Sequence, residues 1–214
     1  MIKFPASVRV HKRLPKEAFY RHLTVSSAFK ENFISEVDSI YVEWSLTPKS
    51  LNFEKSSFSE EILILIIQLK KQDFHKQLLE IIAKQNPHKL FFILSFKNDM
   101  QLAVYHGKLY QSKWMRAEDV YLSAEGFSIE EVWEHLIEKV AFQDLANIPE
   151  NISIDNKLIL RGKIDRLNSE ILKIEKAVWK EQQPKKKFEL YGQLRALKQE
   201  LEDITHGQNE NENT

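Results

Sequence analysis

Apolar residues recur at alternating intervals of three and four positions through the last quarter of the chain. The first stripe comprises Leu160, Ile164, Leu167, Ile171, Ile174 and Val178, and the second comprises Leu190, Leu194, Leu197, Leu201 and Ile204. This average spacing is typical of the seam of a coiled coil. Because only a short connection containing Pro184 separates the two stripes, the pattern predicts an antiparallel helical hairpin.

The middle of the chain shows the patterns of buried strands joined by a helix. Apolar and polar residues alternate strictly from Ile40 to Leu46, which predicts a strand with Trp44 inward and Glu43 outward. Residues 62–69 and 90–96 are almost continuously apolar, as in strands covered on both faces. The stripe between them is helical and comprises Phe74, Leu78, Ile81 and Ile82. The order strand, helix, strand predicts a βαβ unit with parallel strands and a right-handed crossover.

Shorter elements are predicted before this unit. Residues 1–14 read as extended, and Pro15 suits the first turn of a helix whose apolar face includes Phe19 and Leu23. Ser26 suits the N-cap of a second helix. The apolar face of that second helix comprises Phe29, Phe33, Ile34 and Val37.

Further elements are predicted after the unit. Strands near residues 101–105, 109–113 and 119–123 are separated by turn residues, so we expect them to extend the sheet as an antiparallel meander. Ser128 and Glu131 then form the pattern of a capping box, which predicts that a helix begins there.

These elements together predict an α/β (α+β) fold. We expect a mixed sheet of about five to six strands with flanking helices, followed by the C-terminal antiparallel hairpin. The predicted organisation is an α/β domain over residues 1–145, a linker over 146–156, the hairpin over 157–205 and a disordered tail over 206–214.

Composition narrows the classes of function. Positive and negative side chains balance at 31 each, so net charge favours neither a nucleic-acid partner nor its absence. The chain has no cysteine, which excludes thiol chemistry and fits a reducing cytoplasm. The longest apolar run, Ile62–Ile67, is too short to span a membrane, and residues 1–10 lack the apolar core of a signal peptide. We therefore expect a soluble, cytoplasmic protein without a membrane partner.

Several common catalytic motifs are missing from the sequence. The five glycines are widely separated, so no glycine-rich loop can hold a nucleotide phosphate. The seven histidines show no HExxH spacing, and no GxSxG element is present. The sequence therefore predicts neither a resident metal nor a cofactor.

One enzymatic alternative remains open. In nucleases of the PD-(D/E)xK type, two carboxylates on neighbouring strands hold Mg²⁺ and a lysine steadies the attacking water. Gln68 and Lys70 occupy the acid-x-Lys positions at the end of a predicted strand. The candidate upstream acids are Asp38, Glu43, Glu60 and Glu61, of which Glu43 and Glu61 are the preferred pair. The glutamine brings no charge to this site. A divergent nuclease would use Lys70 and require Mg²⁺.

Two basic segments are candidates for contact with a nucleic acid or an acidic partner. The first comprises His11, Lys12 and Arg13 near the N-terminus, and the second comprises Lys185, Lys186 and Lys187 at the predicted end of the hairpin. Trp179 lies beside the second segment and would suit a protein contact if it is exposed.

The order of several segments resembles a bacterial family known as domain-of-unknown-function family 4391. These segments are Val10–Leu23, Val37–Tyr41 followed by Leu46–Pro48, Ile67–Lys70, Asn86–Leu94 and Leu190–Leu201. The resemblance covers essentially the whole chain and implies no assigned activity or catalytic residue. Members tend to be encoded near helicase, methyltransferase and restriction genes of antiphage systems, which implies a partner of that kind. The chain departs from the family pattern at Asn86-Pro-His88, where an Ile-Pro-Tyr-like sequence is usual, which argues against a role for that turn.

The leading hypothesis is a non-enzymatic accessory subunit of a DNA-processing or antiphage defence complex. Its body and hairpin would bind a helicase-, methyltransferase- or restriction-type enzyme, and the hairpin seam would pack on a partner helix or approach DNA. The seam residues concerned are Ile164, Leu167, Ile171, Ile174, Val178, Leu190, Leu194, Leu197 and Leu201. The alternatives are the divergent nuclease and a homodimer formed through the hairpin.

Overall fold

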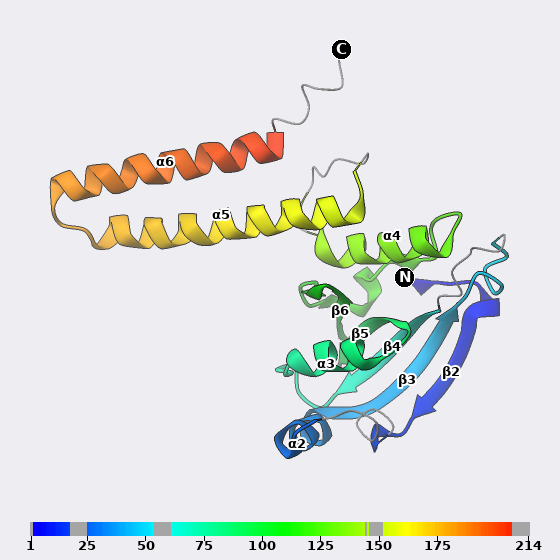
Figure 1. Cartoon of the computed structure of the whole chain (residues 1–214). Coiled ribbons are helices and arrows are strands. Elements are labelled where there is room, and N and C mark those ends of the chain that lie inside the picture. The colour runs from blue at the N-terminus through cyan, green and yellow to red at the C-terminus, as the bar shows by residue number, and fades with distance from the viewer. Residues whose placement is uncertain (1, 18–24, 54–60, 144, 146–151, 207–214) are drawn as a thin grey trace, which may run out of the picture. The chain divides into compact units, whose positions relative to one another are not determined.

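The computed structural model divides the chain into two compact units, Met1–Gln143 and Asp144–Thr214. The residues described below are 2–17, 25–53, 61–143, 145 and 152–206. The first unit is built around a sheet and the second is a pair of helices (Figure 1).

In the described part of the chain, the main sheet has seven strands in the order β2-β3-β4-β5-β6-β7, with β8 also paired to β6. The strands are β2 (Arg9–Leu14), β3 (Val37–Leu46), β4 (Ile62–Leu69), β5 (Lys89–Phe96), β6 (Asp99–His106), β7 (Lys108–Gln111) and β8 (Met115–Arg116). The β4–β5 pair is parallel, and the other neighbours are antiparallel. The mixed sheet expected from the sequence is confirmed.

The predicted βαβ unit is formed by β4, the helix α3 (Gln77–Gln85) and β5 (Figure 1). Two further α-helices in the described part of the first unit are α2 (Ser27–Glu36) and α4 (Ile129–Ala141). Ser26 caps α2, because its hydroxyl accepts a hydrogen bond from the backbone N–H of Phe29 at 3.2 Å. Ser128 caps α4 in the same way through Glu131 N at 3.1 Å. Both predicted helix starts are therefore correct.

Both faces of the central strands are buried, as the continuous apolar runs predicted. One face packs with α2 and α3 in a core that includes Leu65, Ile67, Phe92, Leu94, Phe33 and Leu79. Residues of the opposite parity are buried as well, among them Ile64, Phe91, Ile93 and Val104. Lys89 projects over the Trp133 ring of α4, whereas Lys84 of α3 lies over Tyr105. Because Lys89 and Tyr105 project from opposite faces, α3 and α4 cover different faces of the sheet.

The strict alternation predicted for β3 is interrupted by a bulge. Val42 pairs with Leu65 and Trp44 with Ile64, so Glu43 is an extra residue on its strand. Glu43 is buried and Trp44 is partly exposed, which reverses their predicted environments. The bulge changes which side chains reach each face, and alternation in the sequence does not reveal it.

Two predicted elements differ in their boundaries from the sequence-based expectation. Val37 begins β3 instead of continuing α2, and Ile34 is 46% exposed, so neither belongs to the buried face of that helix. The strand expected at residues 119–123 is only β9 (Leu122–Ser123). It pairs in parallel with β1 (Ile2–Lys3) and does not extend the meander. Phe19 and Leu23, predicted in a first helix, lie outside the described residues.

The second unit consists of α5 (Ile154–Lys180) and α6 (Pro184–His206), which pack against each other (Figure 1). The predicted hairpin is confirmed. Ser153 caps α5 and accepts from the backbone N–H of Asn156, so residues 154–156 of the predicted linker are helical. With 27 residues, α5 is about 40 Å long.

Candidate functional site

The hairpin seam is unequally covered on its two helices. On α5, Ile164, Leu167, Ile171 and Val178 are 4–7% exposed, whereas Leu160 and Ile174 are half-buried. The five predicted seam residues of α6, namely Leu190, Leu194, Leu197, Leu201 and Ile204, are only half-buried. Lys198 of α6 and Glu175 of α5 form an ion pair across the two helices at 2.8 Å. In a pair of helices, each helix covers the apolar stripe of the other from one side only. The leucines of α6 therefore keep one side exposed.

Large apolar side chains outside the seam are also exposed on the hairpin. Ile159 and Leu172 of α5 are 59% and 57% exposed, and Tyr191 of α6 is 53% exposed. Neighbouring ion pairs within α5, such as Arg161–Asp165 and Arg166–Glu170, are the ordinary solvated kind. The helical pair therefore offers apolar surface among charges.

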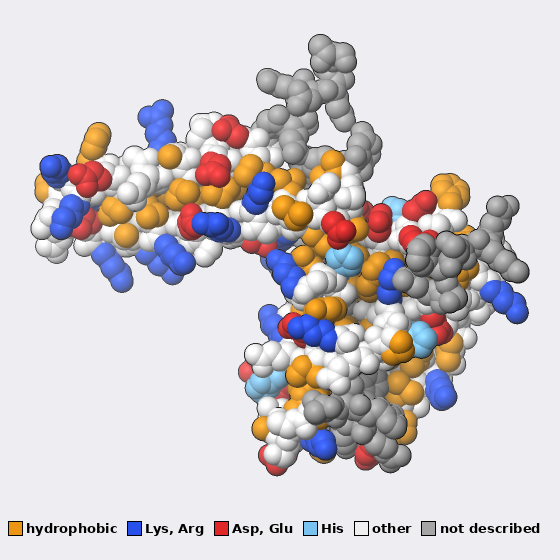
Figure 2. Space-filling model, in the orientation of Figure 1, with side chains coloured by type: hydrophobic (Ala, Val, Ile, Leu, Met, Phe, Trp, Pro, Cys, Tyr) orange, Lys and Arg blue, Asp and Glu red, His pale blue; other side chains and the backbone are white. Residues whose placement is uncertain are grey.

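The end of the hairpin carries the most exposed aromatic residues of α5 and α6. Trp179, near the last residue of α5, is 88% exposed, and Phe188, in the second turn of α6, is 81% exposed. Five lysines and a single glutamate fall within residues 176–188. Figure 2 shows Lys and Arg side chains together with apolar ones at this end of the helical pair. We call residues 176–188 the hairpin tip.

The N-terminal basic segment lies on β2, which pairs only with β3 among the described strands. His11 has a left-handed backbone (φ 46) where the β2–β3 register shifts between Arg9 and Lys12. Its Nδ1 donates to Glu43 Oε2 at 2.6 Å, and its ring stacks on Tyr41. Two bulges, one on each strand, therefore bring His11 and the buried Glu43 together.

Arg9 completes the contacts of this carboxylate. Its Nη2 atom lies 3.3 Å from Glu43 Oε1, so Glu43 is paired with two basic side chains. A buried carboxylate needs such partners, which gives His11 a structural role. Lys12 and Arg13, the other predicted contact residues, are exposed.

Gln68, Lys70 and the preferred acids of the nuclease alternative do not gather at one point. Gln68 and Lys70 lie at the end of β4, whereas Glu61 directly precedes its first residue. Glu61 and Gln68 are therefore roughly 23 Å apart by strand rise. Glu43 lies in the middle of β3 and is paired with His11. Among the described candidate acids, Asp38 alone lies near the end of β4, beside Ser39, which pairs with Gln68. Glu60 lies outside the described residues.

Lys70 and Gln68 already have partners. The Lys70 ammonium donates to the carbonyl oxygen of Ile34 in the last turn of α2 at 3.0 Å. Gln68 Oε1 accepts a hydrogen bond from the Ser39 hydroxyl. Lys16 donates to the carbonyl of Val37 at 2.5 Å. Because the last turn of α2 contains no basic residue of its own, lysines from other elements stabilise its negative end.

Burial lowers the pKa of the Lys16 ammonium, and the positive charge of Lys70 lowers it further. A pocket of about 260 Å³ opens beside Lys16 and is also lined by Arg13, Asp38 and Ser39. This pocket lies near the carboxyl end of β4, where ligands of α/β sheets often bind. The described residues of its lining include a single carboxylate, that of Asp38.

The sequence reasoning missed Glu36, whose carboxylate is 1% exposed. It accepts a hydrogen bond from the backbone N–H of His75 at 3.0 Å and another from the His75 ring, and Lys71 lies 3.1 Å away. Burial alone would raise the pKa of Glu36, but the hydrogen bonds from His75 and Lys71 outweigh it and hold the pKa below its ordinary value. Nothing in the pattern around residue 36 marks it, because its partners lie 35 to 39 positions further along the chain.

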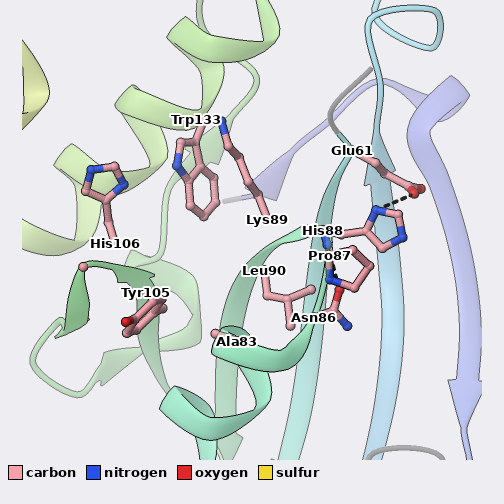
Figure 3. A pocket seen from close by; sticks show the side chains of 11 residues that line it. Glu61, Ala83, Asn86, Pro87, His88, Lys89, Leu90, Tyr105, His106 and Trp133 are labelled. Atoms are coloured by element: carbon pink, nitrogen blue, oxygen red, sulfur yellow. Dashed lines mark hydrogen bonds and ion pairs between the residues drawn. The ribbon is translucent and has the colours of Figure 1, made fainter. Parts of the chain in front are cut away.

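A second pocket, of about 310 Å³, lies at the opposite end of β4 and β5 (Figure 3). His88 Nδ1 is 3.4 Å from Glu61 Oε2, and Glu61 also accepts from the Ser45 hydroxyl. Lys89 and Trp133 form the opposite wall of this pocket. The Asn86–His88 turn, at which the chain departs from the family pattern, is part of this lining.

The described residues form neither a recognisable metal site nor a membrane-spanning helix. Within the described ranges, no group of three or more His, Asp or Glu residues is placed to hold a metal ion. In that same part of the chain, no helix has the length and apolar character needed to cross a bilayer. Neither finding assigns a function.

The mixed sheet with helices on both faces, joined in sequence to a two-helix hairpin, defines the chain as an α/β protein with a helical second unit. The chain belongs to the family described as domain of unknown function (DUF4391), whose model matches residues 2–201. This match confirms the family resemblance. No curated protein and no solved structure is detectably similar to the chain.

Proposed function

We propose that the chain is a non-enzymatic accessory subunit that binds a larger enzyme through its helical hairpin. The observation that carries this proposal is the half-buried leucine stripe of α6. A third helix laid against the stripe would bury its open flank, as in a coiled-coil or bundle interface. Each leucine covered in this way would contribute apolar burial to the complex.

The partner is proposed to be a helicase-, methyltransferase- or restriction-type enzyme of a bacterial DNA-processing or antiphage defence complex. The gene neighbourhood that the family resemblance implies supports this choice. Such a complex would act in the cytoplasm. The exposed Lys12 and Arg13 on β2 would let the body contact DNA held by the partner.

Co-expression with the neighbouring genes tests the proposal. The tagged full chain is compared with a version that ends at Gln143, the last residue of the first unit. We expect a large enzyme to be recovered with the full chain and lost with the shortened one. Recovery with both versions would place the contact on the body, and recovery with neither would reject the adaptor role.

Homodimerisation is the competing use of the same half-buried stripe. Sedimentation of the purified full chain separates the two, because a dimer would show a concentration-dependent mass. We expect a monomer without the partner. A tight dimer that survives the partner's addition would favour the competing function.

A further inference from the structure

We propose that the hairpin tip binds an acidic segment of the partner protein that also carries apolar side chains. This inference rests on the proposed adaptor function and names the chemistry of its contact. It uses the tip, residues 176–188, and not the leucine stripe of α6.

Three lysines of the tip lie where they destabilise their own helix. Lys185, Lys186 and Lys187 occupy the first turn of α6, which contains no acidic residue. The N-terminus of a helix is positive, so acidic residues stabilise this turn and lysines destabilise it. Local stability therefore does not account for three consecutive lysines, whereas attraction of a negatively charged partner does.

The aromatic residues of the tip point to a protein ligand. Trp179 is 88% exposed, although Trp133 of the body is only 5% exposed. Phe188 is 81% exposed on the adjoining helix. Exposed Trp and Phe side chains surrounded by polar groups are the usual centres of binding energy in protein interfaces.

The charges of the hairpin tip favour an acidic protein segment over a second copy of the chain or a nucleic acid. A second copy of the chain would bring two lysine clusters together, which like-charge repulsion disfavours. An extended nucleic acid needs a continuous basic track for its phosphates, but Glu181 and Glu189 interrupt the lysines on either side. A short acidic segment with Leu or Phe side chains satisfies both the lysines and the aromatic residues.

The test measures the anisotropy of a fluorescein-labelled acidic peptide made of Glu, Asp, Leu and Phe, titrated with the full chain. Comparison probes are a peptide with Lys in place of the acids, a single-stranded oligonucleotide and a duplex. We expect binding of the acidic peptide that weakens at high ionic strength and weaker binding of every comparison probe. Equal or tighter binding of either nucleic acid would overturn the proposal.

Matched variants locate the binding. The double variant Lys185→Glu/Lys186→Glu and the variant Trp179→Ala are each expected to weaken peptide binding by about tenfold or more. The controls are Lys163→Glu/Lys173→Glu and Ile159→Ala, which change exposed hairpin residues away from the tip. These should bind within about twofold of the original chain. Equal losses in tip variants and controls would overturn the proposal.

The melting temperature distinguishes a role of the tip lysines in binding from a role in stability. Because Glu suits the first turn of a helix better than Lys, Lys185→Glu/Lys186→Glu should raise or preserve the melting temperature while it weakens binding. A parallel loss of stability and binding would identify the lysines as structural and contradict the proposal.

The outcomes separate this inference from the adaptor function. If co-expression recovers an enzyme that the tip variants still bind fully, the tip inference fails and the adaptor function stands. If the acidic peptide binds the tip but no neighbour is recovered, the adaptor function fails and the tip inference stands.

Discussion

Glu36, at the end of α2, accepts hydrogen bonds from both the backbone N–H and the ring of His75. The carboxylate is almost completely buried, whereas the His75 side chain is half exposed. The contact joins the end of α2 to the segment that leads into α3, across 39 positions of sequence. It is a structural anchor of the first unit.

Replacing Glu36 by alanine should therefore destabilise the first unit. The change leaves the backbone N–H of His75 without its acceptor and removes the ion pair with Lys71, so we expect a loss of about 1–3 kcal/mol in the free energy of unfolding. Urea denaturation measures it. Glu31→Ala, at an exposed position of the same helix, is the control and should be nearly neutral.

The stabilisation by Glu36 should also depend on pH. Its pKa is lowered in the folded state, so the ionised form stabilises the fold above the unfolded pKa. That contribution is lost as pH falls through the folded pKa, in the range from about pH 4.5 downwards. The difference in unfolding free energy between the original chain and Glu36→Gln should shrink over this range. A difference that grows on acidification would contradict the account.

His11 and Glu43 should be energetically coupled across the β2–β3 bulges. We expect Glu43→Ala to be more destabilising than Arg9→Ala, because the carboxylate is buried and the guanidinium is largely exposed. A double-mutant cycle between His11→Ala and Glu43→Ala should give a coupling of about 0.5–2 kcal/mol. Strict additivity of the two changes would mean that the pair contributes nothing.

Lys70 is expected to act as a helix-capping residue. Lys70→Ala removes the hydrogen bond to the Ile34 carbonyl and should cost about 0.5–1 kcal/mol of stability. The same variant tests the nuclease alternative in a plasmid-nicking assay with Mg²⁺ or Mn²⁺. We expect no metal-dependent nicking by the original chain. Nicking that Lys70→Ala abolishes would instead support a catalytic lysine.

Local patterns in the sequence predicted those helices and strands in which buried positions recur at a regular interval. The continuous apolar runs of β4 and β5 and the leucine stripe of α6 repeat one environment over many residues, so their period identifies them. Ser26 and Ser128 were likewise recognisable because a capping hydroxyl and the backbone N–H that donates to it lie three positions apart.

Features that depend on distant partners were not predictable from such patterns. The bulge at Glu43 is an extra residue of β3 relative to β4, and β2 carries its own bulge against β3. The partners of the buried Glu36 are His75 and Lys71. The parallel pairing of β1 with β9 joins segments about 120 positions apart in the sequence. For the candidate site, the sequence indicated the seam and the tip lysines, but the exposure of Trp179 required the structure.

The mass of the co-expressed complex tests the central claim most directly. Light scattering after size exclusion is applied to complexes of the neighbouring enzyme with Leu197→Lys and with Ala196→Lys. Leu197 belongs to the half-buried stripe of α6 and Ala196 is exposed beside it. Circular dichroism of both variants is the control for helix content, which should be unchanged in each. We expect a complex with Ala196→Lys and only free components with Leu197→Lys. A complex of equal mass and yield with both variants would contradict it.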